Sequence, residues 1–187
     1  MDELQLKRIF LQQRQKLPLT IKIEMTKRRI RAWYEQMNGK IYVSFSGGAD
    51  STVLLHIVRS IYPETPAVFV DTGMEFPETR DFVKQTPNVI WVRPKMSFKQ
   101  VCETYGFPVV SKETAQKIEE YRNTKSSVLK DLRAGNVIGR KRHGIPNKWK
   151  YLIDAPFKIS AKCCDILKKQ PLKMFSKDSN LYPITGI

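Results

Sequence analysis

The sequence predicts an α/β protein built around a parallel sheet, and two observations support this prediction. Between residues 41 and 92, three short runs rich in β-branched and aromatic residues alternate with helical segments. Strand, helix, strand, helix and strand at this spacing favour parallel pairing with right-handed crossovers. The composition, with 41% hydrophobic and 27% charged residues over 187 positions, is that of a globular chain. We therefore expect one α/β domain preceded by N-terminal helices.

The expected elements run along the chain without an internal repeat. Two N-terminal helices, over residues 2–16 and 19–37, form a segment 1–40 that we expect to pack on a main domain of residues 41–187. Strands are expected at 41–45, 67–70, 89–92 and 181–187, and helices at 51–61, 78–85, 98–105, 112–134 and 161–176. Residues 135–160, with three glycines and two prolines, are expected to form an excursion or flexible loop. The last strand coincides with the end of the chain, so we expect a domain that is incomplete at its C-terminus.

Charge is distributed unevenly along the chain, which carries 33 Lys and Arg against 18 Asp and Glu, a formal net charge of +15. Residues 112–177 hold 17 basic and 6 acidic side chains, whereas residues 41–111 hold 6 and 7. A basic block of this kind favours a polyanionic partner, either nucleic acid or a multiply phosphorylated small molecule. A solvated basic surface without a partner is the alternative.

Composition also bears on the compartment. No apolar run approaches the roughly 20 residues of a membrane-spanning helix, and the N-terminal residues lack a signal-peptide core, so no membrane partner is expected. Three cysteines, two of them adjacent, do not make a disulfide framework. We expect a cytoplasmic protein, and the sequence leaves open whether it forms a homo-oligomer or lacks a C-terminal portion.

A phosphate-binding turn is predicted where the first strand meets the next helix, at residues 46–52 (SGGADST). Two glycines let the backbone approach an anion closely, and the N–H groups and dipole of the helix N-terminus favour negative charge there. The spacing differs from that of a Walker loop, and a strand–turn–helix connection without a ligand is the alternative. The candidate ligand-binding residues are Ser46, Gly47, Gly48, Asp50, Ser51 and Thr52.

Further candidates lie at the ends of predicted elements. Asp71, with Thr72 and Gly73, follows the second strand, at the edge where open α/β sheets bind ligands, although a turn-forming Asp-Thr-Gly is the alternative. Asp50 is either a helix cap or part of a phosphate or metal environment. Lys112 opens a predicted helix, where the dipole disfavours a cation, so it requires a ligand anion or solvent.

The adjacent Cys163 and Cys164 are candidate metal ligands. Lysines at 162, 168 and 169 flank them, and we expect these cations to lower the thiol pKa values and favour thiolates for metal binding or redox chemistry. Two thiols without a function are the alternative. The two histidines lie in unrelated segments, so a zinc site is not expected.

Residues 46–52 resemble the PP-loop of the N-type ATP pyrophosphatases and adenine nucleotide alpha-hydrolase-like proteins. Three further stretches resemble one branch, the phosphoadenosine phosphosulfate (PAPS) reductase family. They are residues 70–79 (VDTGMEFPET), 110–113 (VSKE) and 162–169 (KCCDILKK). Thr185-Gly186-Ile187 resembles the start of the family's fourth-strand motif. The resemblance runs from about residue 41 to residue 187, in the family's order.

The resemblance implies a Rossmann-like parallel sheet flanked by helices and an adenine nucleotide as ligand: ATP, adenosine phosphosulfate (APS) or PAPS, with Mg as a further candidate cofactor. It implies an enzyme of sulfur metabolism that reduces PAPS or APS to sulfite, or that adenylates an acceptor in the manner of an ATP pyrophosphatase. Asp50 and Lys112 would then be catalytic. In iron–sulfur members, Cys-Cys and a downstream Cys-x-x-Cys hold a 4Fe-4S cluster, so Cys163 and Cys164 would need further ligands from outside this chain.

Two departures from the family pattern favour an alternative. The common PP-loop has Lys where this chain has Ala49, which removes one cation from the phosphate site. The chain also ends before the family's acidic and arginine-containing segment and before the C-terminal catalytic cysteine of the reductases. The alternative is a non-catalytic nucleotide- or nucleic-acid-binding module with a degenerate PP-loop, in which residues 112–177 contact nucleic acid.

Overall fold

The computed structural model describes residues 2–186, apart from the side chain of Lys141, and divides into two compact units. Unit 1 runs to Phe69 and continues with Phe76–Val92 and with the chain from Phe175 onward. Unit 2 comprises Val70–Glu75 and Arg93–Met174.

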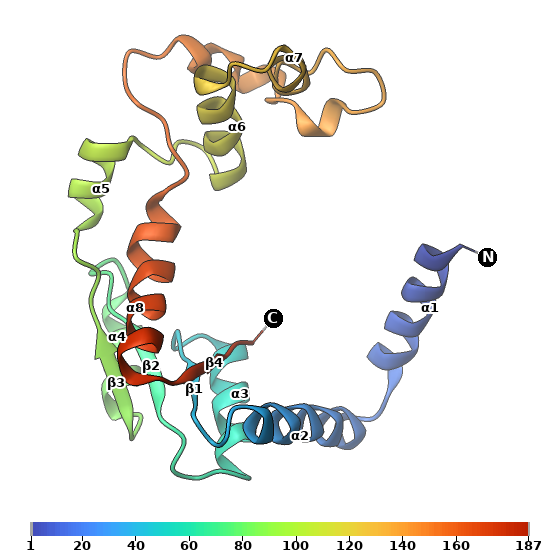
Figure 1. Cartoon of the computed structure of the whole chain (residues 1–187), viewed down its shortest axis with the longest axis vertical. Helices are drawn as coiled ribbons and strands as arrows, with labels where there is room; N and C mark the ends of the chain where they lie inside the picture. Colours follow the sequence, from blue (N-terminus) through green and yellow to red (C-terminus); the bar gives the residue numbers. More distant parts are fainter. Residues whose placement is uncertain (1, 187) are drawn as a thin grey trace. The chain divides into compact units, whose positions relative to one another are not determined.

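Among the described residues, unit 1 is built on a four-stranded parallel sheet in the order β3-β2-β1-β4 (Figure 1). Its strands are β1 (Ile41–Ser44), β2 (Ala67–Val70), β3 (Val89–Val92) and β4 (Tyr182–Ile184). Val43 of β1 pairs with β2 on one side and with β4 on the other. The predicted α/β class is confirmed. Strand β4 is shorter than the predicted strand 181–187, whose last residue lies outside the described residues.

Three helices of unit 1 bury apolar side chains against the sheet: α2 (Leu19–Gln36), α3 (Ala49–Arg59) and α4 (Pro77–Gln85). Each fully buried aliphatic or aromatic side chain contributes about 1.5–3 kcal/mol relative to an exposed one, so this cluster holds the unit together. The core that these helices share with the strands consists of Ile30, Val43, Phe45, Leu55, Val58, Ala67, Phe69 and Val83.

Helix α1 (Glu3–Lys16) precedes α2 and differs from it in burial. A capping box starts α1, because Asp2 accepts the N–H of Gln5 at 2.7 Å while the Gln5 side chain accepts the N–H of Asp2 at 3.1 Å. None of the described side chains of α1 is buried. None of the helices that the structure describes combines the length and apolarity needed to cross a membrane.

Unit 2 is mainly helical, with α5 (Phe98–Tyr105), α6 (Lys112–Asn123) and α7 (Ser127–Ala134). The prediction of one helix over residues 112–134 is wrong. Thr124 takes an extended backbone that ends α6, and the hydroxyl of Ser126 accepts the N–H of Leu129 to cap α7. Serine and threonine compete for backbone hydrogen bonds in this way, which disfavours them inside helices.

The segment 135–160, expected as an excursion or flexible loop, is packed against α6. It contains two 3₁₀ helices, η1 (Lys141–His143) and η2 (Asn147–Asp154). Arg122 of α6 fastens this segment, because its guanidinium donates to the backbone carbonyls of four residues at 2.7–2.9 Å. The four acceptors belong to Leu152, Ile153, Ala155 and Phe157. Buried side chains of α6 and of the segment, together with the following Ala161, form a hydrophobic core. It consists of Ala115, Ile118, Ile145, Leu152, Ile159 and Ala161.

The π-helical turn η3 (Asp165–Lys169) leads directly into α8 (Gln170–Ser179). The N–H of Gln170 donates to the carbonyl of Asp165, five residues earlier. Pro171 has no N–H to continue an α-helical ladder, and its ring disfavours the preceding α-helical turn. Pro171 is therefore accommodated by a wider turn within a continuous helical run.

Candidate functional site

The turn between β1 and α3 contains a glycine that other residues cannot replace without strain. Gly47 has a φ of +74°, where side chains are disfavoured. A Cβ atom on Gly47 would lie 2.9 Å from Cγ2 of Thr79 and 3.0 Å from Cγ2 of Val83, both on α4. The backbone of the turn thus packs directly against α4, and this contact fixes its path.

Helix α3 begins without a side-chain cap. Its N-cap is Gly48, which has an extended backbone and no side chain to accept a hydrogen bond from the first turn. Helices α5 and α6 instead begin at Ser97 and Ser111, whose hydroxyls each accept the backbone N–H three residues on. No described side chain caps the first turn of α3, so its N–H groups are open at the end where the helix dipole attracts negative charge.

The hydroxyl groups of the turn act mainly on the turn itself. Ser51 Oγ and Thr52 Oγ1 both donate to the carbonyl of Gly48 at 2.9 Å. Ser51 Oγ also accepts the N–H of Ser46 at 3.2 Å and lies 3.0 Å from the Ser46 hydroxyl. The sequence predicts these hydroxyls as ligand donors, whereas the geometry has them stabilise the turn. Backbone N–H groups are therefore the main donors that remain for a phosphate or sulfate.

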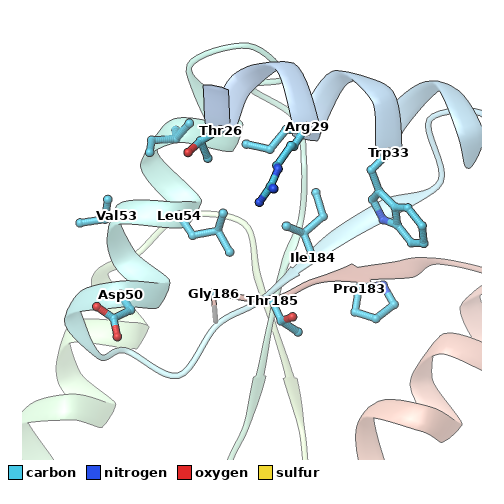
Figure 2. Close-up of a pocket in the computed structure, with 12 residues that line it drawn as sticks. Thr26, Arg29, Trp33, Asp50, Val53, Leu54, Pro183, Ile184, Thr185 and Gly186 are labelled. Carbon is cyan, nitrogen blue, oxygen red and sulfur yellow. The ribbon is translucent and has the colours of Figure 1, made fainter. Parts of the chain in front are cut away.

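Asp50 and Ala49 occupy the first turn of α3 and are both exposed. Because Gly48 is the cap, the interpretation of Asp50 as the cap is wrong. Figure 2 shows the Asp50 carboxylate directed away from Leu54, at the beginning of the helix. An acidic side chain is stabilised there by the helix dipole even when it binds no ligand.

Asp71, in unit 2, is buried in a turn that satisfies most of its own polar groups. Its Oδ1 accepts the N–H of Gly73 at 3.2 Å, and its Oδ2 lies 3.5 Å from Nε of Arg93. Glu75 closes the turn by accepting the N–H of Thr72 at 3.0 Å and the Thr72 hydroxyl at 2.7 Å. The structure therefore places Asp71, Thr72 and Gly73 in one hydrogen-bonded turn, and their role in a ligand site stays a prediction. Glu75 and Arg93, which are not among the sequence-predicted site residues, also contact this turn.

Lys112 begins α6 and is exposed. Its place in the fold brings it near the cysteine segment of the same unit. The pKa of Asp165 is lowered first by the hydrogen bond from Lys169 and, to a smaller extent, by the positive charge of Lys112. The positive charge of Lys112 thus acts on Asp165, the first residue of η3.

Cys163 and Cys164 lie immediately before η3, and the expectation that lysines lower their thiol pKa is wrong for Cys163. Burial is the largest effect and raises the pKa of Cys163, and the neighbouring Cys164 thiol raises it further. The flanking lysines have other partners: Lys169 forms an ion pair with Asp165 at 2.7 Å, and Lys162 lies over the ring of Tyr105 at 5.2 Å. Their charges therefore do not produce a thiolate at Cys163.

The cysteine pair does not by itself fit an iron–sulfur cluster. A 4Fe-4S cluster takes four cysteine thiolates, and the chain holds only one further cysteine, Cys102, which is buried. Within residues 2–186, no three or more His, Cys, Asp and Glu side chains gather in a way that could hold a metal ion. The candidate metal ligands thus remain two adjacent thiols, with the pKa of Cys163 raised.

Several cations of the basic segment 112–177 have structural partners. Lys117 is buried, where it donates to the carbonyl of Arg142 at 2.9 Å and pairs with Glu113 at 2.6 Å. Arg133 donates to Glu120 at 2.6 Å and to the carbonyl of His143. Together with Arg122, these residues show that part of the positive charge holds α6, α7 and the following segment together.

The fold and the turn at residues 46–52 define an α/β protein with an uncapped helix start after its central strand. The chain belongs to the family described as the phosphoadenosine phosphosulfate reductase domain, which matches residues 40–143, more than half of its length. The predicted family is confirmed.

Three curated relatives illustrate the similarity. An uncharacterized protein of Methanocaldococcus jannaschii is 29% identical over 122 residues, which are 61% of this chain and 29% of the relative. An adenosine 5'-phosphosulfate reductase of Bacillus cereus is 27% identical over 41% of this chain and 36% of its own length. A phosphoadenosine 5'-phosphosulfate reductase of Photorhabdus laumondii is 36% identical over 38% of this chain and 31% of its own length. The chain thus spans about a third of the length of the curated relatives it matches.

Proposed function

We propose that this chain binds a phosphorylated adenine nucleotide and that the turn at residues 46–52 holds an anionic group of that nucleotide. The observation that carries the proposal is the uncapped N-terminus of α3, whose backbone is fixed against α4 by Gly47. Open N–H groups and a helix dipole stabilise phosphate or sulfate without any cationic side chain. This explains how Ala49 can stand in the turn without removing its affinity for an anion.

The family favours a phosphosulfate nucleotide, APS or PAPS, over ATP, because two of the relatives are named as reductases of these compounds. Adenylation of an acceptor with ATP, as in the ATP pyrophosphatases, is the competing chemistry. Relative affinities for the three nucleotides distinguish the two. Asp71, Thr72, Gly73 and Lys112 remain predicted nucleotide-binding residues, with Asp50 and Lys112 as the predicted catalytic ones.

Reduction of a bound phosphosulfate to sulfite needs a thiol that attacks the sulfur atom as the thiolate. Burial raises the pKa of Cys163, so this thiol is protonated at neutral pH and is a poor nucleophile. The proposal therefore centres on nucleotide binding. A dithiol reductant added to the assay would supply the electrons for sulfite release.

Two substitutions of the cap test the binding proposal without disturbing the fold. A Cβ atom on Gly48 would lie 3.4 Å from the Ser46 hydroxyl and meets no closer neighbour, and both Asp and Asn are good N-caps. In Gly48→Asp, a carboxylate occupies the position of the ligand anion, whereas Gly48→Asn introduces the same shape without charge. We expect calorimetry to show nucleotide binding at least about tenfold weaker in Gly48→Asp than in Gly48→Asn. Equal affinities, or no heat with ATP, APS or PAPS at millimolar concentration, would contradict the proposal.

A second candidate function is binding of single-stranded nucleic acid by η2 of unit 2. Tyr151 is 66% exposed and lies beside Trp149, with ring centroids 6.2 Å apart, and Lys148 is placed over the Trp149 ring. Aromatic rings next to cations stack on bases and neutralise phosphates. Fluorescence anisotropy with a labelled oligonucleotide tests this function. Binding that weakens with salt and is reduced severalfold in Tyr151→Ala would support it, and salt-dependent binding unchanged in that variant would contradict it.

A further inference from the structure

Unit 1 contains a pocket of about 660 Å³ whose wall includes Asp50, in the first turn of α3, but otherwise lies outside the turn at residues 46–52. Helices α2 and α3 and the chain from Pro183 to Gly186 line it, and it is open to solvent (Figure 2). Its walls are mainly apolar and include Ile30, Leu54, Ile57, Pro183 and Ile184. Small-molecule sites typically have volumes of about 300–1,000 Å³ and are lined in this way.

One cation reaches into this cavity. Arg29 extends from α2 into the space between Leu54 and Ile184 (Figure 2). Its side chain forms no hydrogen bond or ion pair with the other residues that the structure describes. A guanidinium presents five N–H donors, so Arg29 can pair with a carboxylate, sulfonate or phosphate through two parallel hydrogen bonds.

Trp33 adds a flat wall and a donor. Its ring lines the cavity, and its indole nitrogen is covered by protein atoms without a hydrogen-bond partner among residues 2–186. Buried polar groups are nearly always hydrogen-bonded in folded proteins. A small shift of the Trp33 ring would let its indole N–H donate to an acceptor atom of a bound ligand, which would provide this missing partner.

We infer that this cavity binds a small organic anion with an apolar body and a single acidic group. The apolar body would displace water from the aliphatic walls, and the acidic group would pair with Arg29. This inference goes beyond nucleotide binding, because the groups that carry it, Arg29 and Trp33 of α2, are not candidate nucleotide-binding residues, although Asp50 lines the same pocket.

The test uses the full chain and two fluorescent probes of nearly the same shape. Anilinonaphthalene sulfonate carries an aromatic body and one sulfonate, whereas N-phenylnaphthylamine has the body without the charge. Arg29→Gln removes the cation from the cavity. Arg31→Gln, on the same helix but outside this cavity, is the matched control for loss of one positive charge.

We expect saturable binding of the sulfonate probe that weakens about fivefold or more in Arg29→Gln and less than twofold in Arg31→Gln. The neutral probe should bind both variants equally, and nucleotide affinity should be unchanged in Arg29→Gln. The inference is overturned if the sulfonate probe does not saturate, or if the two variants weaken its binding to the same extent. If the wild-type chain does not bind nucleotide but the sulfonate probe behaves as expected in both variants, the result counts against the proposed function and not against this inference.

Discussion

The two units use their charged groups differently. Unit 2 contains 19 basic and 9 acidic side chains, a net charge of +10, whereas unit 1 contains 14 and 9, a net charge of +5. The proposed phosphate site nevertheless lies in unit 1, where backbone N–H groups provide the attraction. In unit 2, Lys117, Arg122 and Arg133 donate to carbonyls and carboxylates of their own unit. The proposed anion site therefore lies in the unit with the smaller net charge.

The helix starts also differ, although not strictly by unit: Asp2 caps α1 of unit 1, whereas α2, α3 and α4 begin without a side-chain cap. In unit 2, serine hydroxyls close the N-termini of α5, α6 and α7, so that their first turns are satisfied internally. In unit 1, α3 begins at a glycine and is left open. A cap stabilises a helix by about 1 kcal/mol, and its absence at α3 is consistent with a ligand in the place of the cap.

The largest expected effect follows from removing the cation that fastens unit 2. In Arg122→Ala, four backbone carbonyls lose their donor, and we expect the free energy of unfolding to fall by about 3 kcal/mol. Urea denaturation measures this change. Lys125→Ala, at an exposed position just beyond α6, is the control and should change stability by less than about 0.5 kcal/mol. Similar small effects from both variants would mean that the charge of unit 2 is not structural.

An intermediate effect is expected at the thiols of unit 2. Because the pKa of Cys163 is raised, this thiol should react with iodoacetamide severalfold more slowly in the native chain at pH 7.5 than in urea. Its rate should continue to rise at pH values where an unfolded cysteine is already fully ionised. Since the folded state holds the proton more tightly, the contribution of this thiol to stability is present at low pH and lost as the pH rises.

Peptide mapping by mass spectrometry separates Cys163 from the other two thiols. A native Cys163 that reacts faster than the unfolded one would restore the prediction of a lysine-activated thiolate. A thiolate of this kind would support redox chemistry in unit 2.

The smallest effect is expected from adding a cation to the turn of unit 1. Ala49 is exposed in the first turn of α3, so Ala49→Lys can place an ammonium group next to a bound phosphate. We expect calorimetry to show nucleotide affinity about three- to tenfold higher, because a charge-assisted hydrogen bond is added to the backbone donors. Ala49→Gln, with a neutral chain of similar length, should leave affinity nearly unchanged. Equal affinities for both variants would place the ligand anion elsewhere.

Local patterns predicted most of unit 1. β-branched and aromatic runs marked β1, β2 and β3, and the glycine pair between β1 and α3 marked the anion-binding turn. These features depend on neighbours in the sequence, since strand propensity and turn chemistry act over a few residues. Within the turn itself, the sequence did not indicate which residue caps the helix and which groups bond to each other. Gly48, and not Asp50, is the N-cap of α3. The Ser51 hydroxyl, predicted to be a ligand donor, donates to the carbonyl of Gly48.

The amino-acid sequence by itself determined the α/β class, the family and the position of the glycine turn, because periodicity and short motifs encode them locally. Tertiary structure alone decided which cations have structural partners and in which direction the pKa of Cys163 shifts. The pKa of Cys163 depends on burial, the role of Arg122 depends on carbonyls about 30 residues away, and the cavity beside Arg29 depends on the meeting of α2, α3 and β4. Desolvation and hydrogen bonding are set by what surrounds a group in space, which adjacent residues in the chain do not specify.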